Sequence, residues 1–104
     1  MTTQAKVGSR VAAPADVLLV TSPACHFCAD AEDALAELSK EFDLRISRID
    51  ARSPEGMALV QEYGAAMSPL VLLDGEYVSA GRLPRGKVRK LLEARADGVD
   101  GALR

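Results

Sequence analysis

Two cysteines separated by two residues are the side chains of this chain best suited to chemistry. They lie in the sequence Cys25-His26-Phe27-Cys28 and are both of the cysteines among the 104 residues. A disulfide between them would close a loop too short to add much stability through the entropy of the unfolded chain. The spacing therefore indicates a pair kept for its reactivity, in which a thiolate sulfur attacks a disulfide.

The segments on either side of the cysteines predict a buried strand followed by a helix. Val17-Leu18-Leu19-Val20 is apolar without alternation, as in a strand covered on both faces. Beyond Ser22-Pro23, apolar residues recur every three or four positions from Phe27 to Phe42, so a helix is expected to begin at the cysteines.

A cysteine in the first turn of a helix lies near free backbone N–H groups and the positive end of the helix dipole, which favour the thiolate. Cys25 is therefore the predicted nucleophile, and Cys28, one turn further on, is the predicted resolving thiol. His26, when protonated, would add positive charge that tunes Cys25, or it is an exposed spacer without effect. Phe27 is expected to anchor the helix in the core.

Metal binding is the alternative interpretation of the same residues. A structural zinc site needs four ligands, usually from two separated pairs, and the chain has two cysteines and one histidine. An iron-sulfur cluster shared between two subunits would need thiolates from each of them. Neither arrangement is favoured, and no metal is predicted.

Five further elements follow along the chain. Leu44–Asp50 has strand character, and Ser53-Pro54 predicts the start of a short helix that ends at Gly64. Asp74-Gly75 predicts a tight turn between two antiparallel strands, residues 68–73 and 76–80. Pro84 is expected to open a last helix that places three apolar residues on one face: Val88, Leu91 and Leu92.

The alternation of strands and helices indicates an α/β domain over residues 16–96. Residues 1–15 form either a lead-in or an edge strand around residues 6–11, and both interpretations stay open. Residues 97–104 form a polar C-terminal tail. A right-handed crossover would make the first two strands of the domain parallel neighbours.

Composition and charge exclude several classes of protein. The chain is 48% hydrophobic with a formal net charge of −2, which argues against disorder and against binding of nucleic acid or an anionic membrane by bulk electrostatics. Its apolar runs are far shorter than the roughly 20 residues of a membrane span. Residues 1–6 do not form a charged leader before an apolar region, so a cytoplasmic location is expected. A monomer is expected as well.

The stretch from Asp16 to Ala96 resembles the thioredoxin superfamily, because a cysteine pair opens its first helix and Ser68-Pro69 begins its third strand. The resemblance implies a thioredoxin-like fold: a central mixed four-stranded sheet, or five strands with the N-terminal edge, flanked by three helices. It also implies that Pro69 is cis and faces the cysteines. Ser68, Pro69 and Gly81 would then line the substrate site.

The chain mixes features of two branches of that superfamily. Thioredoxins proper carry Trp-Cys-Gly-Pro-Cys, whereas here Ala24 precedes the pair and the sequence has no Trp. Glutaredoxins resemble this chain in the aromatic residue at Phe27. Where they hold the glutathione amine with an acidic residue after Gly-Gly, this chain has Gly81-Arg82.

The last segment is rich in basic residues, which form either a solvated helix face or a surface for an acidic partner or for the carboxylates of glutathione. They are Arg82, Arg85, Lys87, Arg89, Lys90 and Arg95.

These features together predict a thiol-disulfide oxidoreductase that reduces protein disulfides through Cys25 and Cys28 and is itself reduced by an upstream reductase. No cofactor beyond the redox-active cysteine pair is expected. Two alternatives stay open. One is a glutaredoxin-like enzyme that removes glutathione from substrates, with glutathione as co-substrate. The other is a non-catalytic adaptor or redox sensor of the same fold.

Overall fold

Strand β2 (Ala15–Thr21) lies at the centre of the fold in the computed structural model, which describes residues 14–96. It pairs in parallel with β3 (Leu44–Asp50) and antiparallel with β4 (Leu70–Leu73). β5 (Glu76–Ala80) completes a mixed four-stranded sheet of order β3-β2-β4-β5. The parallel pairing of β2 with β3 confirms that the first two strands of the domain are parallel neighbours, as a crossover connection requires.

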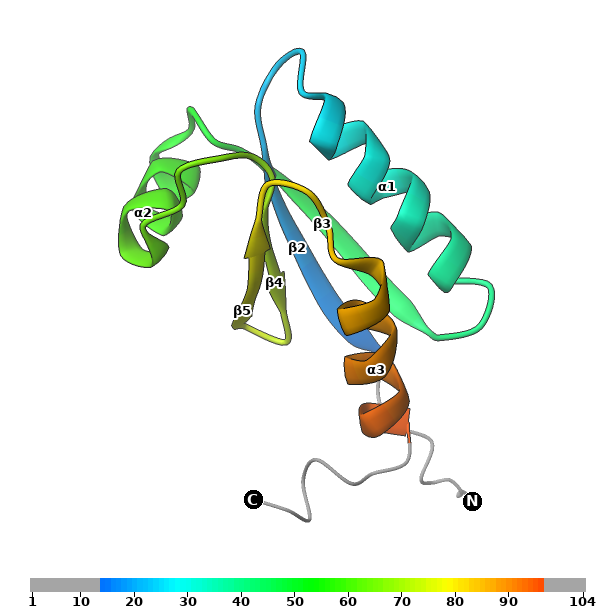
Figure 1. The fold of residues 1–104 in the computed structure, drawn as a ribbon. Coiled ribbons are helices and arrows are strands. Elements are labelled where there is room, and N and C mark those ends of the chain that lie inside the picture. The colour runs from blue at the N-terminus through cyan, green and yellow to red at the C-terminus, as the bar shows by residue number, and fades with distance from the viewer. Residues whose placement is uncertain (1–13, 97–104) are drawn as a thin grey trace.

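Helices cover both faces of this sheet (Figure 1). α1 (His26–Leu38) and α3 (Arg85–Ala96) lie over one face, and α2 (Pro54–Tyr63) lies over the other. Four strands and three helices in this order form the expected thioredoxin-like α/β fold.

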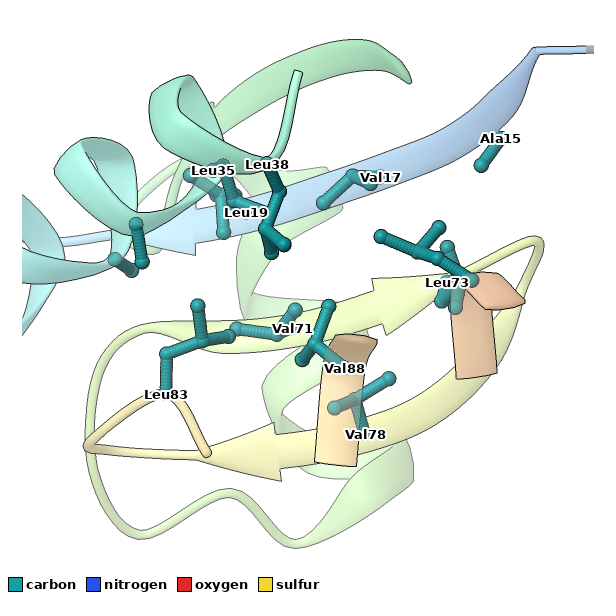
Figure 2. Close-up of a cluster of buried hydrophobic side chains, with 13 residues drawn as sticks. Ala15, Val17, Leu19, Leu35, Leu38, Val71, Leu73, Val78, Leu83 and Val88 are labelled. Carbon is teal, nitrogen blue, oxygen red and sulfur yellow. The ribbon is translucent and has the colours of Figure 1, made fainter. Parts of the chain in front are cut away.

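The core is divided by the sheet into two clusters, because successive side chains of a strand point to opposite faces. In the larger cluster, Val17 and Leu19 of β2 pack with Leu35 of α1 and Val88 of α3 (Figure 2). In the smaller cluster, Val20, Leu70 and Leu72 pack against the inner side of α2. The unalternated apolar run at residues 17–20 is thus explained by burial on both faces, as predicted.

The β4–β5 hairpin follows the turn chemistry of its sequence. Asp74 and Gly75 both adopt positive φ, 51° and 83°, which a two-residue hairpin turn of the favoured twist requires. The Asp74 carboxylate also accepts a hydrogen bond of 3.0 Å from the backbone N–H of Asp16. The hairpin is therefore fastened to the beginning of β2 as well as closed by its own turn.

Helix α2 begins and ends at the predicted residues. The Ser53 hydroxyl accepts a hydrogen bond of 3.0 Å from the Gly56 N–H, and Pro54 occupies the first turn. Gly64 ends the helix in the left-handed conformation with φ of 61°.

Two sequence predictions about helices are wrong in detail. α1 ends at Leu38, so Phe42 lies beyond it and packs against the larger cluster from the turn that leads into β3. In α3, Val88 and Leu92 are buried, whereas Leu91 is 39% exposed. The reason is that α3 meets the sheet along a narrow stripe of residues four apart, and Leu91 falls to the side of that stripe.

The edge strand considered around residues 6–11 and the polar tail at 97–104 lie outside the described residues. Among residues 14–96, no helix is long and apolar enough to cross a membrane.

Candidate redox site

Cys25 lies at the N-terminal cap of α1, where the chain turns out of the sheet. Ala24, just before it, has a left-handed φ of 51°, and Cys25 itself is extended. The Cys25 sulfur accepts a hydrogen bond of 3.1 Å from the backbone N–H of Cys28. The helix thus begins at the cysteines, as expected, and one N–H group of its first turn, that of Cys28, is bonded to the Cys25 sulfur.

Cys25 and Cys28 are joined in a disulfide, with their Cα atoms 5.2 Å apart. The two residues differ in accessibility, because Cys28 is buried at 6% exposure while Cys25 is partly exposed. Cys25 is therefore the more accessible of the two cysteines.

Ser68 and Pro69, which directly precede β4, lie near the Cys25 sulfur as well. The carbonyl oxygen of Ser68 lies 3.7 Å from the Cys25 sulfur, close enough to accept a weak hydrogen bond from the Cys25 thiol in the reduced protein. The Ser68–Pro69 peptide bond is cis, which confirms the expectation from the resemblance, and Pro69 is fully buried. Among the backbone hydrogen bonds of residues 14–96, none uses the Ser68 N–H as donor.

Gly81, which directly follows β5, lies beside Ser68 and Pro69. These three residues are called the wall of the site. Its N–H donates a hydrogen bond of 3.0 Å to the Pro69 carbonyl oxygen. Its φ of 109° lies in the region that favours glycine, and a Cβ there would lie 3.5 Å from the Cβ of Met67. The structure therefore brings Ser68 to the Cys25 sulfur and links Gly81 to the adjacent Pro69.

The two residues between the cysteines lie at the surface of the site. His26 is exposed at the first position of α1. Phe27 is partly buried and belongs to neither hydrophobic cluster, so the expectation that it anchors α1 in the core is wrong. The bend at Ala24 and the capping position of Cys25 set the start of α1 instead.

Three acidic residues of α1 are in ion pairs, and one of them, Glu37, pairs with Lys40 just beyond the helix. Arg85 at the start of α3 donates to Asp30, and Arg48 of β3 donates to Glu32. The hydrogen bond from Arg48 lowers the pKa of Glu32. Among residues 14–96 no group of three or more His, Cys, Asp or Glu side chains is placed to hold a metal ion.

Sequence reasoning missed Met67, which precedes Ser68 and is 53% exposed. A cavity of about 310 Å³ opens between α2 and the segment 65–68, and it is lined by Met57, Met67 and Ser68 among others. The signal for it was an apolar residue, Met67, directly before the Ser68-Pro69 step. Ser68 lines this cavity, and its carbonyl oxygen also lies 3.7 Å from the Cys25 sulfur, so the cavity adjoins the disulfide.

Comparisons with known proteins agree with this geometry. A family model described as a glutaredoxin-like domain (DUF836) matches residues 16–93. A probable thioredoxin from Archaeoglobus fulgidus is 25% identical over 82 residues, which are 79% of this chain and 90% of that protein.

Solved structures show the same fold. The solution structure of a thioredoxin-like protein from Clostridium perfringens is similar with a TM-score of 0.63 at 17% identity, over 80% of this chain and 71% of that one. A mutant thioredoxin from Halobacterium salinarum NRC-1 is similar with a TM-score of 0.54 at 24% identity, over 77% of this chain and 73% of that one.

Proposed function

Because this chain belongs to the glutaredoxin-like domain family (DUF836), within the thioredoxin superfamily, we propose that it is a thiol-disulfide oxidoreductase that reduces disulfides of protein substrates. Its family and its cysteine pair support a redox role. One observation supports the more specific proposal that the protein reduces disulfides of protein substrates. The partly exposed Cys25 sulfur caps α1 beside the Ser68 carbonyl, with Cys28 buried behind it.

The proposed reaction transfers two electrons in two exchanges. The Cys25 thiolate attacks one sulfur of the substrate disulfide, forms a mixed disulfide with it, and releases the other substrate sulfur as a thiolate that takes up a proton. The Cys28 thiolate then attacks the Cys25 sulfur and releases the second substrate thiolate. The products are a substrate dithiol and the Cys25–Cys28 disulfide, which is the oxidised form that the structure describes.

The position of Cys25 supports its role as the nucleophile. The Cys28 N–H that donates to the Cys25 sulfur would stabilise negative charge there, and so would the N-terminal end of α1. Cys28, being buried, is protected from substrate and attacks only the sulfur that its own helix holds nearby. His26, exposed beside Cys25, would add positive charge when protonated.

Ser68 supports a mode of substrate binding. Its N–H is not used as a donor in the backbone hydrogen bonds of residues 14–96, and its carbonyl faces the reacting sulfur. An extended substrate segment could pair with both groups, as a strand pairs with a sheet edge. Pro69 and Gly81, hydrogen-bonded to each other, would hold this wall in place.

The oxidised protein must be reduced again, and we propose that an upstream dithiol reductase does so by the same exchange in reverse. A reductant role fits a reducing compartment, so we extend the proposal to a cytoplasmic protein that acts as a monomer on protein disulfides. No role with nucleic acid or membranes is proposed.

A second candidate is a glutathione-dependent enzyme, which the glutaredoxin-like family model favours. In that reaction the Cys25 thiolate attacks the glutathione sulfur of a glutathionylated substrate and releases the substrate thiolate. The thiolate of a free glutathione then attacks the Cys25–glutathione disulfide, which releases the Cys25 thiolate and glutathione disulfide. Arg82, which stands where glutaredoxins carry an acidic residue, disfavours it.

The test is the reduction of insulin disulfides with dithiothreitol as the terminal dithiol, comparing wild type with Cys25→Ser. Cys25→Ser should fall to the uncatalysed rate, and Ser22→Ala, a change of a nearby partly exposed hydroxyl, should keep the wild-type rate. Full activity in Cys25→Ser would refute the mechanism. A wild-type rate no faster than dithiothreitol alone would favour the sensor or adaptor interpretation.

A further inference from the structure

The segments that surround the disulfide carry an unbalanced charge. They are residues 22–28, 65–69 and 80–84, and they contain no Asp or Glu. Their charged side chains are Arg82 and, when protonated, His26. These three segments therefore carry positive charge and no negative charge, although the chain as a whole carries a formal net charge of −2.

Arg82 differs from the other arginines that the structure describes. Six of these seven pair with a carboxylate: Arg45, Arg48, Arg52, Arg85, Arg89 and Arg95. Within residues 14–96, Arg82 has no such partner, and it is exposed. Its guanidinium group is available to an anionic group from outside the chain.

The backbone fixes where this charge is presented. Arg82 directly follows Gly81, whose N–H is bonded to the Pro69 carbonyl, and the preceding Ser68 carbonyl lies 3.7 Å from the Cys25 sulfur. The left-handed φ of Gly81 turns the chain from β5 toward α3 at this point. Arg82 is therefore one residue away from the wall of the redox site.

We propose that Arg82 is a specificity-determining residue that favours substrates with an Asp or Glu side chain next to the reactive disulfide. The inference rests on the proposed function and names the substrate class of that site. A guanidinium group binds a carboxylate through two parallel hydrogen bonds, and no carboxylate of the site segments competes for it. Salt screens exposed charges over about 8 Å at physiological ionic strength, so only residues close to the substrate cysteine are selected.

The test uses three synthetic peptides that differ only in the residues flanking a single cysteine: Glu, Gln or Lys. The cysteine is held as a mixed disulfide with 2-thiopyridine, whose release is measured by absorbance with the reduced protein. Wild type should react roughly tenfold faster with the Glu peptide than with the Lys peptide at low salt, and the ratio should fall toward one at high salt.

Variants of Arg82 test whether its side chain causes the preference for the Glu peptide over the Lys peptide. Arg82→Gln should abolish the ratio and Arg82→Glu should invert it. Arg82→Lys, which keeps the charge but cannot form the two parallel hydrogen bonds, should lower the ratio without abolishing it. Lys90→Gln removes the same charge from an exposed position of α3 and should leave the ratio unchanged.

The outcomes separate this inference from the proposed function. Reaction of all three peptides at one rate, or a ratio that survives in Arg82→Gln, would overturn the role of Arg82 and leave the proposed function standing. No reaction above the Cys25→Ser background with any peptide would overturn both.

Discussion

The Cys25 sulfur lies 3.7 Å from the carbonyl oxygen of Ser68, a residue 43 positions away in the sequence. The pairing of β2 with β4 brings these residues together, since Val20 near the end of β2 stands opposite Leu70 at the start of β4. The loop that follows β2 and the loop that precedes β4 must therefore lie side by side at the same end of these two strands. The redox site is a direct consequence of this antiparallel register.

Replacing Cys28 by serine should trap the first intermediate of the proposed cycle. The Cys25 sulfur stays accessible, but no internal thiol remains to release the substrate. Incubation of reduced Cys28→Ser with an oxidised protein substrate, followed by non-reducing electrophoresis and mass spectrometry, should show an adduct at Cys25. The double variant Cys25→Ser, Cys28→Ser is the control and should form none; an adduct there would contradict the assignment.

Leu35 and Leu91 should respond very differently to truncation, because Leu35 is fully buried and Leu91 is 39% exposed. Leu35→Ala leaves a cavity between α1 and the sheet and should lower the free energy of unfolding by about 2–5 kcal/mol. Leu91→Ala should lower it by less than about 1 kcal/mol. Urea denaturation measures both values, and similar losses in the two variants would show that α3 packs differently.

Gly56 and Gly86 form a matched pair of helical glycines. A Cβ at Gly56 would clash with the backbone of Asp50 and lie 2.8 Å from the Cα of Ala51, so Gly56→Ala should destabilise the protein by about 3 kcal/mol. A Cβ at Gly86 meets nothing within 4 Å, so Gly86→Ala should stabilise α3 by about 0.5–1 kcal/mol. Thermal denaturation should move Tm in opposite directions; a neutral Gly56→Ala would contradict the packing of α2 on the loop after β3.

The ionisation of Asp50 makes the stability of the fold depend on pH in the acidic range. Hydrogen bonds from the Arg52 side chain, aided by the Arg52 backbone N–H, lower the pKa of Asp50 from 3.8 to about 2. A carboxyl whose pKa is lower in the folded than in the unfolded chain stabilises the fold when ionised. This contribution is complete above the unfolded value of 3.8 and is lost as the pH falls toward 2.

Titration of the Asp50 carboxyl carbon by NMR tests this pair. The midpoint should be near pH 2 in wild type and should rise toward 3.8 in Arg52→Gln, while Lys90→Gln should leave it unchanged. A wild-type midpoint near 3.8 would mean that the ion pair does not form in solution.

Local features of the fold could be predicted from sequence because their causes are local. Ser53, Pro54 and Gly64 mark the ends of α2 by capping and backbone preference, and Asp74-Gly75 fixes the hairpin. In the candidate site, the cysteine pair identified the chemistry. The resemblance to the superfamily, rather than any physical property of an isolated Ser-Pro step, identified Pro69 as cis.

Features that depend on tertiary contacts could not be predicted in this way. Apolar periodicity does not reveal that α1 ends before Phe42 or that Leu91 falls outside the buried stripe of α3. The cavity beside Met67 depends on how α2 meets the segment before Ser68. The sequence does not show that Arg82 lacks a carboxylate partner within residues 14–96. This becomes apparent only when the partners of the other described arginines are known.

The dithiol mechanism of Cys25 and Cys28 is tested most directly by equilibrating the protein across glutathione redox buffers, alkylating the free thiols, and weighing the intact species by mass spectrometry. We expect a single two-electron couple in which Cys25 and Cys28 pass together from dithiol to disulfide, without a persistent glutathione adduct. A dominant glutathione adduct on Cys25 would support the glutathione-dependent enzyme instead. The absence of a Cys25–Cys28 disulfide at every redox poise would contradict the dithiol mechanism itself.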